Sequence, residues 1–182
     1  MLNDQSRDFL LCLLWFFLYR LLYLVIVRYK IKRDGSNIHR QFSHEYGKGQ
    51  SSSICNKLVA APSGVAADDV EWCTYVISTV HAVVVVCVIT AFLLKAGPWT
   101  TEEMVFGTNP TLRHLFDFSL AYFVSDGFLM TVWKLEGWAV MAAHHAVAGL
   151  PYAVYNFAPG CRCGLFVLAL FLLVEVCTLP LN

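Results

Sequence analysis

The sequence contains few charged residues. Only 14% of its 182 residues are Asp, Glu, Lys or Arg, whereas soluble domains carry about 25%. The 13 basic and 13 acidic residues give a formal net charge of zero. Without a basic excess, bulk charge gives no support for nucleic-acid binding, and we expect none. Hydrophobic residues make up 58% of the chain, which is typical of a membrane protein.

The sequence also lacks a disulfide framework and a metal-binding motif. Four of the seven cysteines fall inside apolar runs, where cysteine acts as a small hydrophobic residue. Cys161 and Cys163 form a C-x-C pair that we expect to be free thiols. Two histidines and a carboxylate could bind a metal, but C-x2-C, H-x3-H and H-E-x-x-H spacings are absent. We therefore predict neither a metal site nor a cofactor.

Five apolar blocks approach the length of about 20 residues that a helix needs to cross a bilayer. They are Phe9–Val27, Trp72–Leu94, Leu115–Trp133, Trp138–Phe157 and Gly164–Leu181. The third and fourth blocks carry polar residues and rank lower by hydropathy. The sequence predicts an all-α fold, a bundle of about five transmembrane helices in a multi-pass membrane protein.

A basic segment follows the first block and sets the expected orientation. Residues 28–57 hold seven of the thirteen Lys and Arg residues, and such segments stay in the cytosol. This basic stop favours a retained helix over a signal peptide. We expect a first transmembrane helix over residues 1–28 and a flexible, polar cytosolic loop over residues 29–70. A membrane domain is expected over residues 71–182.

Few ionisable residues lie inside the apolar blocks, and each of them needs a reason. A charged side chain near the bilayer centre costs about 2.5–3.5 kcal/mol on insertion scales. Helix–helix hydrogen bonds in membranes contribute only about 0.6 kcal/mol each, so cohesion alone is a weak reason to bury several such groups. The residues concerned are Arg20, His81, Asp117, Asp126, His144, His145 and Glu175.

Four helices are predicted to hold an ionisable group at a similar depth. At about 1.5 Å per residue, Asp126, the pair His144 and His145, Glu175 and His81 lie roughly 11–14 Å from the expected cytosolic ends of their helices. Adjacent helical residues point about 100° apart, so one histidine of the pair can face the bundle interior. Asp126, His144, His145 and Glu175 are the candidate catalytic residues. The alternative is structural, with the carboxylates pairing with histidines and His81 serving only in packing.

Four segments after Trp72 share their order and spacing with one family. They read WCTYVISTVHAVVVV, SLAYFVSDGFLM, MAAHHAVAG and EVCTLPLN. The first has a Trp, a Ser and then His-Ala, and the second has a Ser, an aromatic residue and an Asp. The third has paired histidines, and the last has a Glu, a Thr and an Asn. Together they resemble the TLC domain, which ceramide synthases share with the translocating-chain-associated membrane proteins.

The resemblance implies a reaction, but this sequence lacks part of the residue pattern that goes with it. In ceramide synthases, the paired histidines and a downstream pair of aspartates are implicated in joining an acyl group from acyl-CoA to a sphingoid base. This chain keeps the histidines but has no Asp-x-x-Asp after them; Glu175, Thr178 and Asn182 stand there instead. That pattern is similar to TLC domain proteins other than ceramide synthases. The family also implies further spans after Asn182, so a partial domain is expected.

Three functions remain open at this point. The first is lipid handling, either by regulating membrane lipid composition or by binding a lipid within the bundle. The second is an acyltransferase of the ceramide synthase type, with a histidine as general base and acyl-CoA as donor. The third is a structural or translocon-associated role. The resemblance favours membrane lipids as partners and the endoplasmic reticulum over the plasma membrane, and leaves the oligomeric state open.

Overall fold

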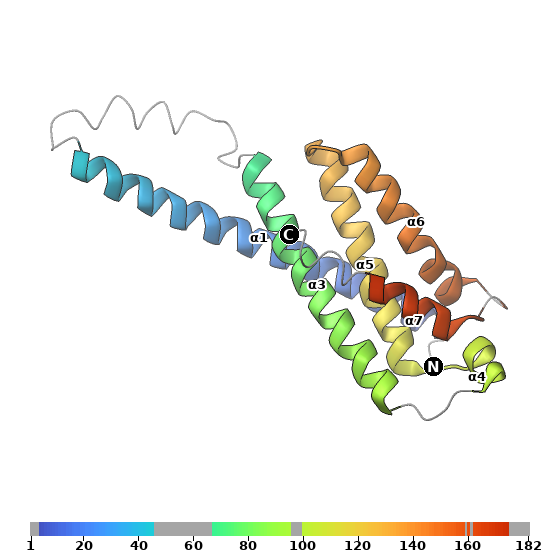
Figure 1. Cartoon of the computed structure of the whole chain (residues 1–182). Coiled ribbons are helices and arrows are strands. Elements are labelled where there is room, and N and C mark those ends of the chain that lie inside the picture. The colour runs from blue at the N-terminus through green and yellow to red at the C-terminus, as the bar shows by residue number, and fades with distance from the viewer. Residues whose placement is uncertain (1–3, 46–66, 96–99, 159, 161, 175–182) are drawn as a thin grey trace.

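The computed structural model describes residues 4–45, 67–95, 100–158, 160 and 162–174. Every regular element in this described part is a helix (Figure 1). The helices are α1 (Asp4–Glu45), α3 (Ala67–Lys95), α4 (Thr101–Phe106), α5 (Pro110–Trp133), α6 (Trp138–Phe157) and α7 (Leu165–Leu173). The all-α membrane bundle predicted from the sequence is confirmed.

Three segments within the described residues are long and apolar enough to cross a membrane. They are Gln5–Asp34, Asp69–Lys95 and Thr101–Trp133. Helix α6 has 20 residues, about the length of a span, but its histidines lower its hydropathy. Helix α7 is described over nine residues only, and the end of the fifth predicted block lies outside the described residues.

Helix α1 is longer than the sequence analysis expected. It continues without a break to Glu45, so residues 29–45 are helical and do not belong to a flexible loop. The segment contains no proline, and it includes two lysines, two arginines and a glutamine, which are good helix formers. Lys30 also pairs with Asp69 at 2.9 Å and lies over the Trp72 ring at 5.3 Å, which holds α1 against the start of α3. The remainder of the predicted loop, residues 46–66, lies outside the described residues.

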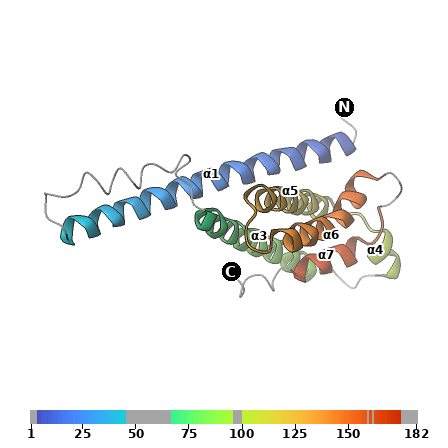
Figure 2. The ribbon, with the colours of Figure 1, turned by 90° about the horizontal axis from the view of Figure 1, so that it is seen from above.

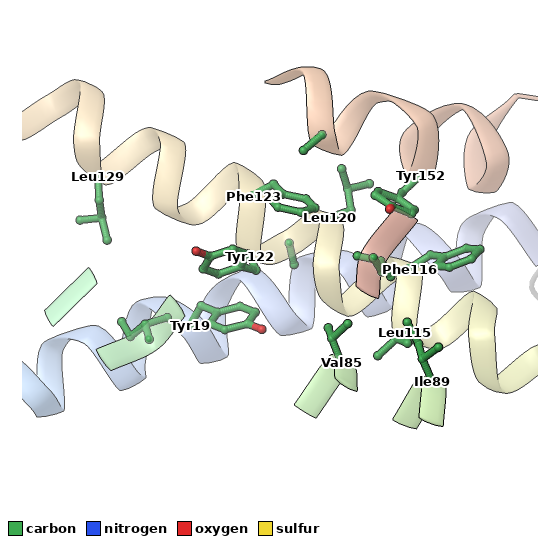
Figure 3. Packing of buried hydrophobic residues seen from close by; sticks show 14 of the residues in the cluster. Tyr19, Val85, Ile89, Leu115, Phe116, Leu120, Tyr122, Phe123, Leu129 and Tyr152 are labelled. Atoms are coloured by element: carbon green, nitrogen blue, oxygen red, sulfur yellow. The ribbon is translucent and has the colours of Figure 1, made fainter. Parts of the chain in front are cut away.

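Helix α5 lies at the centre of the bundle. Figure 2 shows it between α1 on one side and α6 and α7 on the other. Its buried face includes Phe116, Tyr122 and Phe123, each less than 5% exposed. Figure 3 shows Tyr122 facing Tyr19 of α1, and Phe116 near Tyr152 of α6; the ring centroids of these pairs are 5.8 Å and 5.1 Å apart. The core is therefore organised around α5, where aromatic side chains pack among a larger number of aliphatic ones.

A tight turn joins α5 to α6 and sets their relative register. Lys134 ends α5 in the left-handed conformation with φ 49°, and Gly137 precedes α6 with φ 66°. The other end of α5 is fixed by Asn109, whose side chain accepts a hydrogen bond from the Leu112 backbone at 3.1 Å, and by Pro110 in the first turn. Because the connection is so short, α5 and α6 run antiparallel, and residues at equal distances from the turn lie opposite each other.

Candidate functional site

Asp126 of α5 and His145 of α6 meet inside the bundle. Asp126 precedes Lys134 by eight residues and His145 follows Gly137 by eight, so both lie about 12 Å from the turn. His145 Nε2 is 2.9 Å from Asp126 Oδ2, and the two side chains are only 5% and 3% exposed. The contact joins the two central helices through a carboxylate and an imidazole in an otherwise apolar setting.

The pair retains unused hydrogen-bonding capacity. Asp126 Oδ1 and His145 Nδ1 are buried, and neither has a hydrogen-bond partner in the described part of the chain. Buried polar atoms in folded proteins are nearly always paired, so each exception calls for an explanation. One explanation that the geometry allows is a polar group of a ligand that hydrogen-bonds to these two atoms.

Of the other two candidate residues, the structure describes only His144. His144 lies on the exposed side of α6, although its ring centroid is only 5.6 Å from that of His145. One histidine of the pair therefore faces the bundle and the other faces outward, as the 100° helical step requires. Glu175 lies outside the described residues, so its position relative to His145 stays a prediction.

His81 lies elsewhere in the core than its predicted depth suggested. It contacts Ser119 of α5, with His81 Nε2 and Ser119 Oγ 3.1 Å apart and both residues fully buried. Ser119 precedes Asp126 by seven residues, which is about 10 Å along α5. The difference arises because α3 begins at Ala67 and not at Trp72, so His81 lies further from the start of its helix.

An aromatic side chain connects the two histidines. The Tyr122 ring stacks on His81 with centroids 4.0 Å apart and planes inclined by 15°. The same ring meets His145 edge-on at 5.8 Å. Tyr122 therefore packs against a histidine of α3 and a histidine of α6 at once, and it fixes where each ring can lie.

A second buried polar cluster lies near the start of α5. Arg113 pairs with Asp8 of α1, and Arg162 lies 3.9 Å from the same carboxylate. Asp117 accepts a hydrogen bond of 2.6 Å from Asn156 of α6. Asp8 and Asp117 are fully buried. This cluster joins α1, α5 and α6 at the end of the bundle opposite the α5–α6 turn.

The sequence analysis missed several of these partners. Asp117 was given no partner, Ser119 and Tyr122 entered only as part of the family segment SLAYFVSDGFLM, and Asn156 was not considered. Helical spacing could have found two of them. Ser119 lies two helical turns before Asp126, and Asn156 lies eleven residues after His145, so each shares a face with a candidate residue. Among the described residues, no group of three or more His, Cys, Asp or Glu side chains could bind a metal ion.

Comparison with known proteins gives one match. A family model described as the TLC domain covers residues 71–182. The matched region contains His81, Asp126 and His145, and α1 lies entirely before it. None of the curated proteins and none of the solved structures compared with the chain matches it.

Proposed function

This chain belongs to the TLC domain family, as its four sequence segments predicted, and on that premise we propose that it is an integral membrane protein of lipid handling. In this proposal, the polar part of a membrane lipid binds at His145 and Asp126, and the protein thereby regulates membrane lipid composition. We expect it to act in the endoplasmic reticulum membrane.

The observation that carries the proposal is the incomplete pairing of the two buried residues. Asp126 Oδ1 and His145 Nδ1 have no hydrogen-bond partner in the described part of the molecule. A lipid amine, amide or hydroxyl could satisfy both atoms, since a carboxylate accepts hydrogen bonds and an imidazole nitrogen accepts or donates. Packing alone does not need this pair, because α5 and α6 already meet through Phe123, Tyr152 and Ala148.

Acyl transfer is the second candidate, and the contact between Asp126 and His145 favours it. A carboxylate beside an imidazole orients the ring and stabilises its protonated form. His145 would then remove a proton from an amine or hydroxyl as that group attacks the thioester carbonyl of an acyl-CoA. The C–S bond of the thioester then breaks, and CoA leaves as a thiol that takes up the proton from His145. We propose that His144, whose ring lies beside His145, contributes to the same site. Glu175 remains a proposed member of the site on the strength of the sequence alone.

Lipidomics of cells that express the full-length gene tests the proposal. Cells with His145→Ala or Asp126→Asn should show the lipid profile of cells without the gene, and His144→Ala should give a smaller change. The loss of this single polar contact between helices should cost no more than a membrane helix–helix hydrogen bond, about 0.6 kcal/mol, so the variants should accumulate normally. His114→Ala is the matched control, because His114 is an exposed histidine of α5 far from the pair.

The outcomes separate the three functions. Unchanged lipid profiles in His145→Ala cells at equal protein level would exclude a role of the pair in lipid handling. A loss of the variant protein by degradation, in proportion to the change in lipid profile, would indicate a structural role. Consumption of acyl-CoA by the purified full-length protein, abolished by His145→Ala, would favour acyl transfer over lipid binding alone.

A further inference from the structure

Arg20 is a basic residue placed within an apolar transmembrane segment. It lies near the middle of Gln5–Asp34, the first of the segments able to cross a membrane. Its neighbours Phe17, Leu21 and Leu24 are 63%, 58% and 49% exposed, as expected for side chains that face lipid. A guanidinium in such a setting is costly and needs either a polar partner or a path to the membrane surface.

The described contacts of Arg20 are aromatic. Its guanidinium carbon lies 5.5 Å from the centroid of the Tyr23 ring and 5.2 Å from that of Phe128 on α5. Arg20 Nη1 is buried and has no hydrogen-bond partner among the described residues. No described carboxylate forms an ion pair with this side chain. The cation–π contacts fix the position of the guanidinium but do not use its N–H donors.

The basic residues Arg28 and Lys30 follow Arg20 along α1 and mark the expected cytosolic surface. Arg20 precedes Arg28 by eight residues, about 12 Å along the helix. Long basic side chains within a membrane extend toward the headgroup region, so the guanidinium of Arg20 is within reach of a lipid headgroup that enters beside α1.

An apolar stripe of α5 runs past the guanidinium. It consists of Val124, Phe128 and Val132, which are spaced by four residues and are 53%, 50% and 57% exposed. Arg20 lies over the central member, Phe128. The surface thus combines a cation that has donors to spare with an exposed strip of apolar side chains. That combination matches the two parts of an amphipathic anion.

We propose that Arg20 binds the phosphate of an anionic phospholipid whose acyl chain lies along the α5 stripe. A guanidinium donates two parallel N–H bonds to a phosphate, and this would satisfy Nη1 and neutralise the charge of the guanidinium. The acyl chain would extend from the phosphate along the stripe, in the direction away from the membrane surface. The site is separate from His145 and Asp126, and it stands whether or not that pair handles lipid.

Lipid-dependent thermal stability of the full chain tests the site. The protein in neutral detergent micelles is titrated with phosphatidic acid, with diacylglycerol of the same acyl chains, and with inorganic phosphate. Phosphatidic acid should raise the unfolding midpoint, whereas diacylglycerol and inorganic phosphate should not. Arg20→Gln should weaken the apparent affinity for phosphatidic acid by about tenfold or more, the loss expected for charge-assisted hydrogen bonds.

Matched variants separate this site from general charge attraction. Arg28→Gln removes an exposed cation from the same helix and should retain most of the affinity. Arg20→Lys keeps the charge but not the bidentate donor geometry, so it should bind phosphatidic acid with intermediate affinity. It replaces Arg20→Gln as the test variant if Arg20→Gln does not fold. His145→Ala should bind phosphatidic acid like the wild type.

Three results would overturn the proposal. One is equal affinity of Arg20→Gln and wild type for phosphatidic acid. Another is equal stabilisation by diacylglycerol or by inorganic phosphate, which would place recognition in the acyl chains or in a soluble anion. The last is loss of binding in His145→Ala with retention in Arg20→Gln, which would move the lipid to the other site.

Discussion

Two buried carboxylates of this bundle differ in the charges around them. Asp8 lies against Arg113, with Arg162 and Arg7 also within 4 Å, so cations surround it. Asp126 faces a single imidazole, although Oδ1 of each carboxylate lacks a hydrogen-bond partner in the described structure. A buried charge that is matched by permanent opposite charges favours a structural role, whereas one that faces only a titratable imidazole is suited to a ligand. This contrast leads us to assign stability to the first and binding to the second.

The ion pair between Asp8 and Arg113 gives a prediction about stability. Arg113→Met should lower the free energy of unfolding by about 3 kcal/mol, because it leaves a buried carboxylate without its main partner. Two other cations nearby keep the loss at the low end of the usual range. Thermal unfolding in micelles measures the effect. The double variant Asp8→Asn with Arg113→Met should lose less than Arg113→Met alone, and a larger loss in the double variant would argue against the pairing.

At the scale of helices, the α5–α6 turn determines whether the candidate site forms. Asp126 and His145 meet because each lies eight residues from the turn, and one residue of slip would rotate each side chain by about 100°. The turn depends on Gly137, which has φ 66°. Residues other than glycine adopt this backbone conformation only at a cost in conformational energy. The register of the site therefore rests on a glycine outside it.

Gly137→Ala is expected to destabilise the protein by about 1 kcal/mol, since an L-residue with a Cβ is strained in the left-handed region. No atom lies within 4 Å of the added Cβ, so the effect would come from the backbone alone. Gly127→Ala is the control, because Gly127 is helical and its added Cβ would lie 3.5 Å from His145 Cβ, an ordinary contact. Denaturation of both variants gives the comparison. Equal stability of Gly137→Ala and wild type would contradict the role of this turn.

The sequence predicted some elements well and others poorly, for physical reasons. Apolar length and periodicity report burial in lipid, so the helices of the first four apolar blocks and the start of the fifth could be predicted. The shared level of Asp126 and His145 followed from their equal distance from the turn. The helical continuation of α1 to Glu45 is polar, and a search for apolar runs does not detect it. The short helix α4 was also missed, although Thr100 and Glu103 form a capping box that the sequence contains as T-x-x-E.

Partners across helices were beyond the sequence for a different reason. The contact between His81 and Ser119 depends on where α3 begins and on how it packs against α5. Neither is encoded in the spacing within one helix. His145 and Asp126 could be matched because a tight turn links their helices, and no such turn links α3 to α5. Sequence reasoning was therefore reliable within a hairpin and weak between helices that are distant along the chain.

For the whole molecule, the two ends of the bundle differ in chemistry. At one end, Lys30 lies over Trp72 and Lys134 lies 4.7 Å from the Trp138 ring centroid. Figure 1 shows the start of α3 and the α5–α6 turn at this same end. Tryptophan and lysine together are typical of a membrane–water interface. At the opposite end, the cations Arg113 and Arg162 lie around the buried carboxylate of Asp8, which offsets part of their charge.

This asymmetry and the basic residues 28–57 predict that the end with Lys30 and Lys134 faces the cytosol. A protease site inserted between Tyr46 and Ser53 should then be cut by protease added outside sealed microsomes. The same site inserted at Gly160, in the connection between α6 and α7, lies at the opposite end and should be protected until detergent is added. Cleavage at Gly160 with protection near Ser53 would reverse the orientation. It would also place His145 and Asp126 in the luminal half, beyond the reach of a cytosolic acyl-CoA, and would leave lipid binding as the function to pursue.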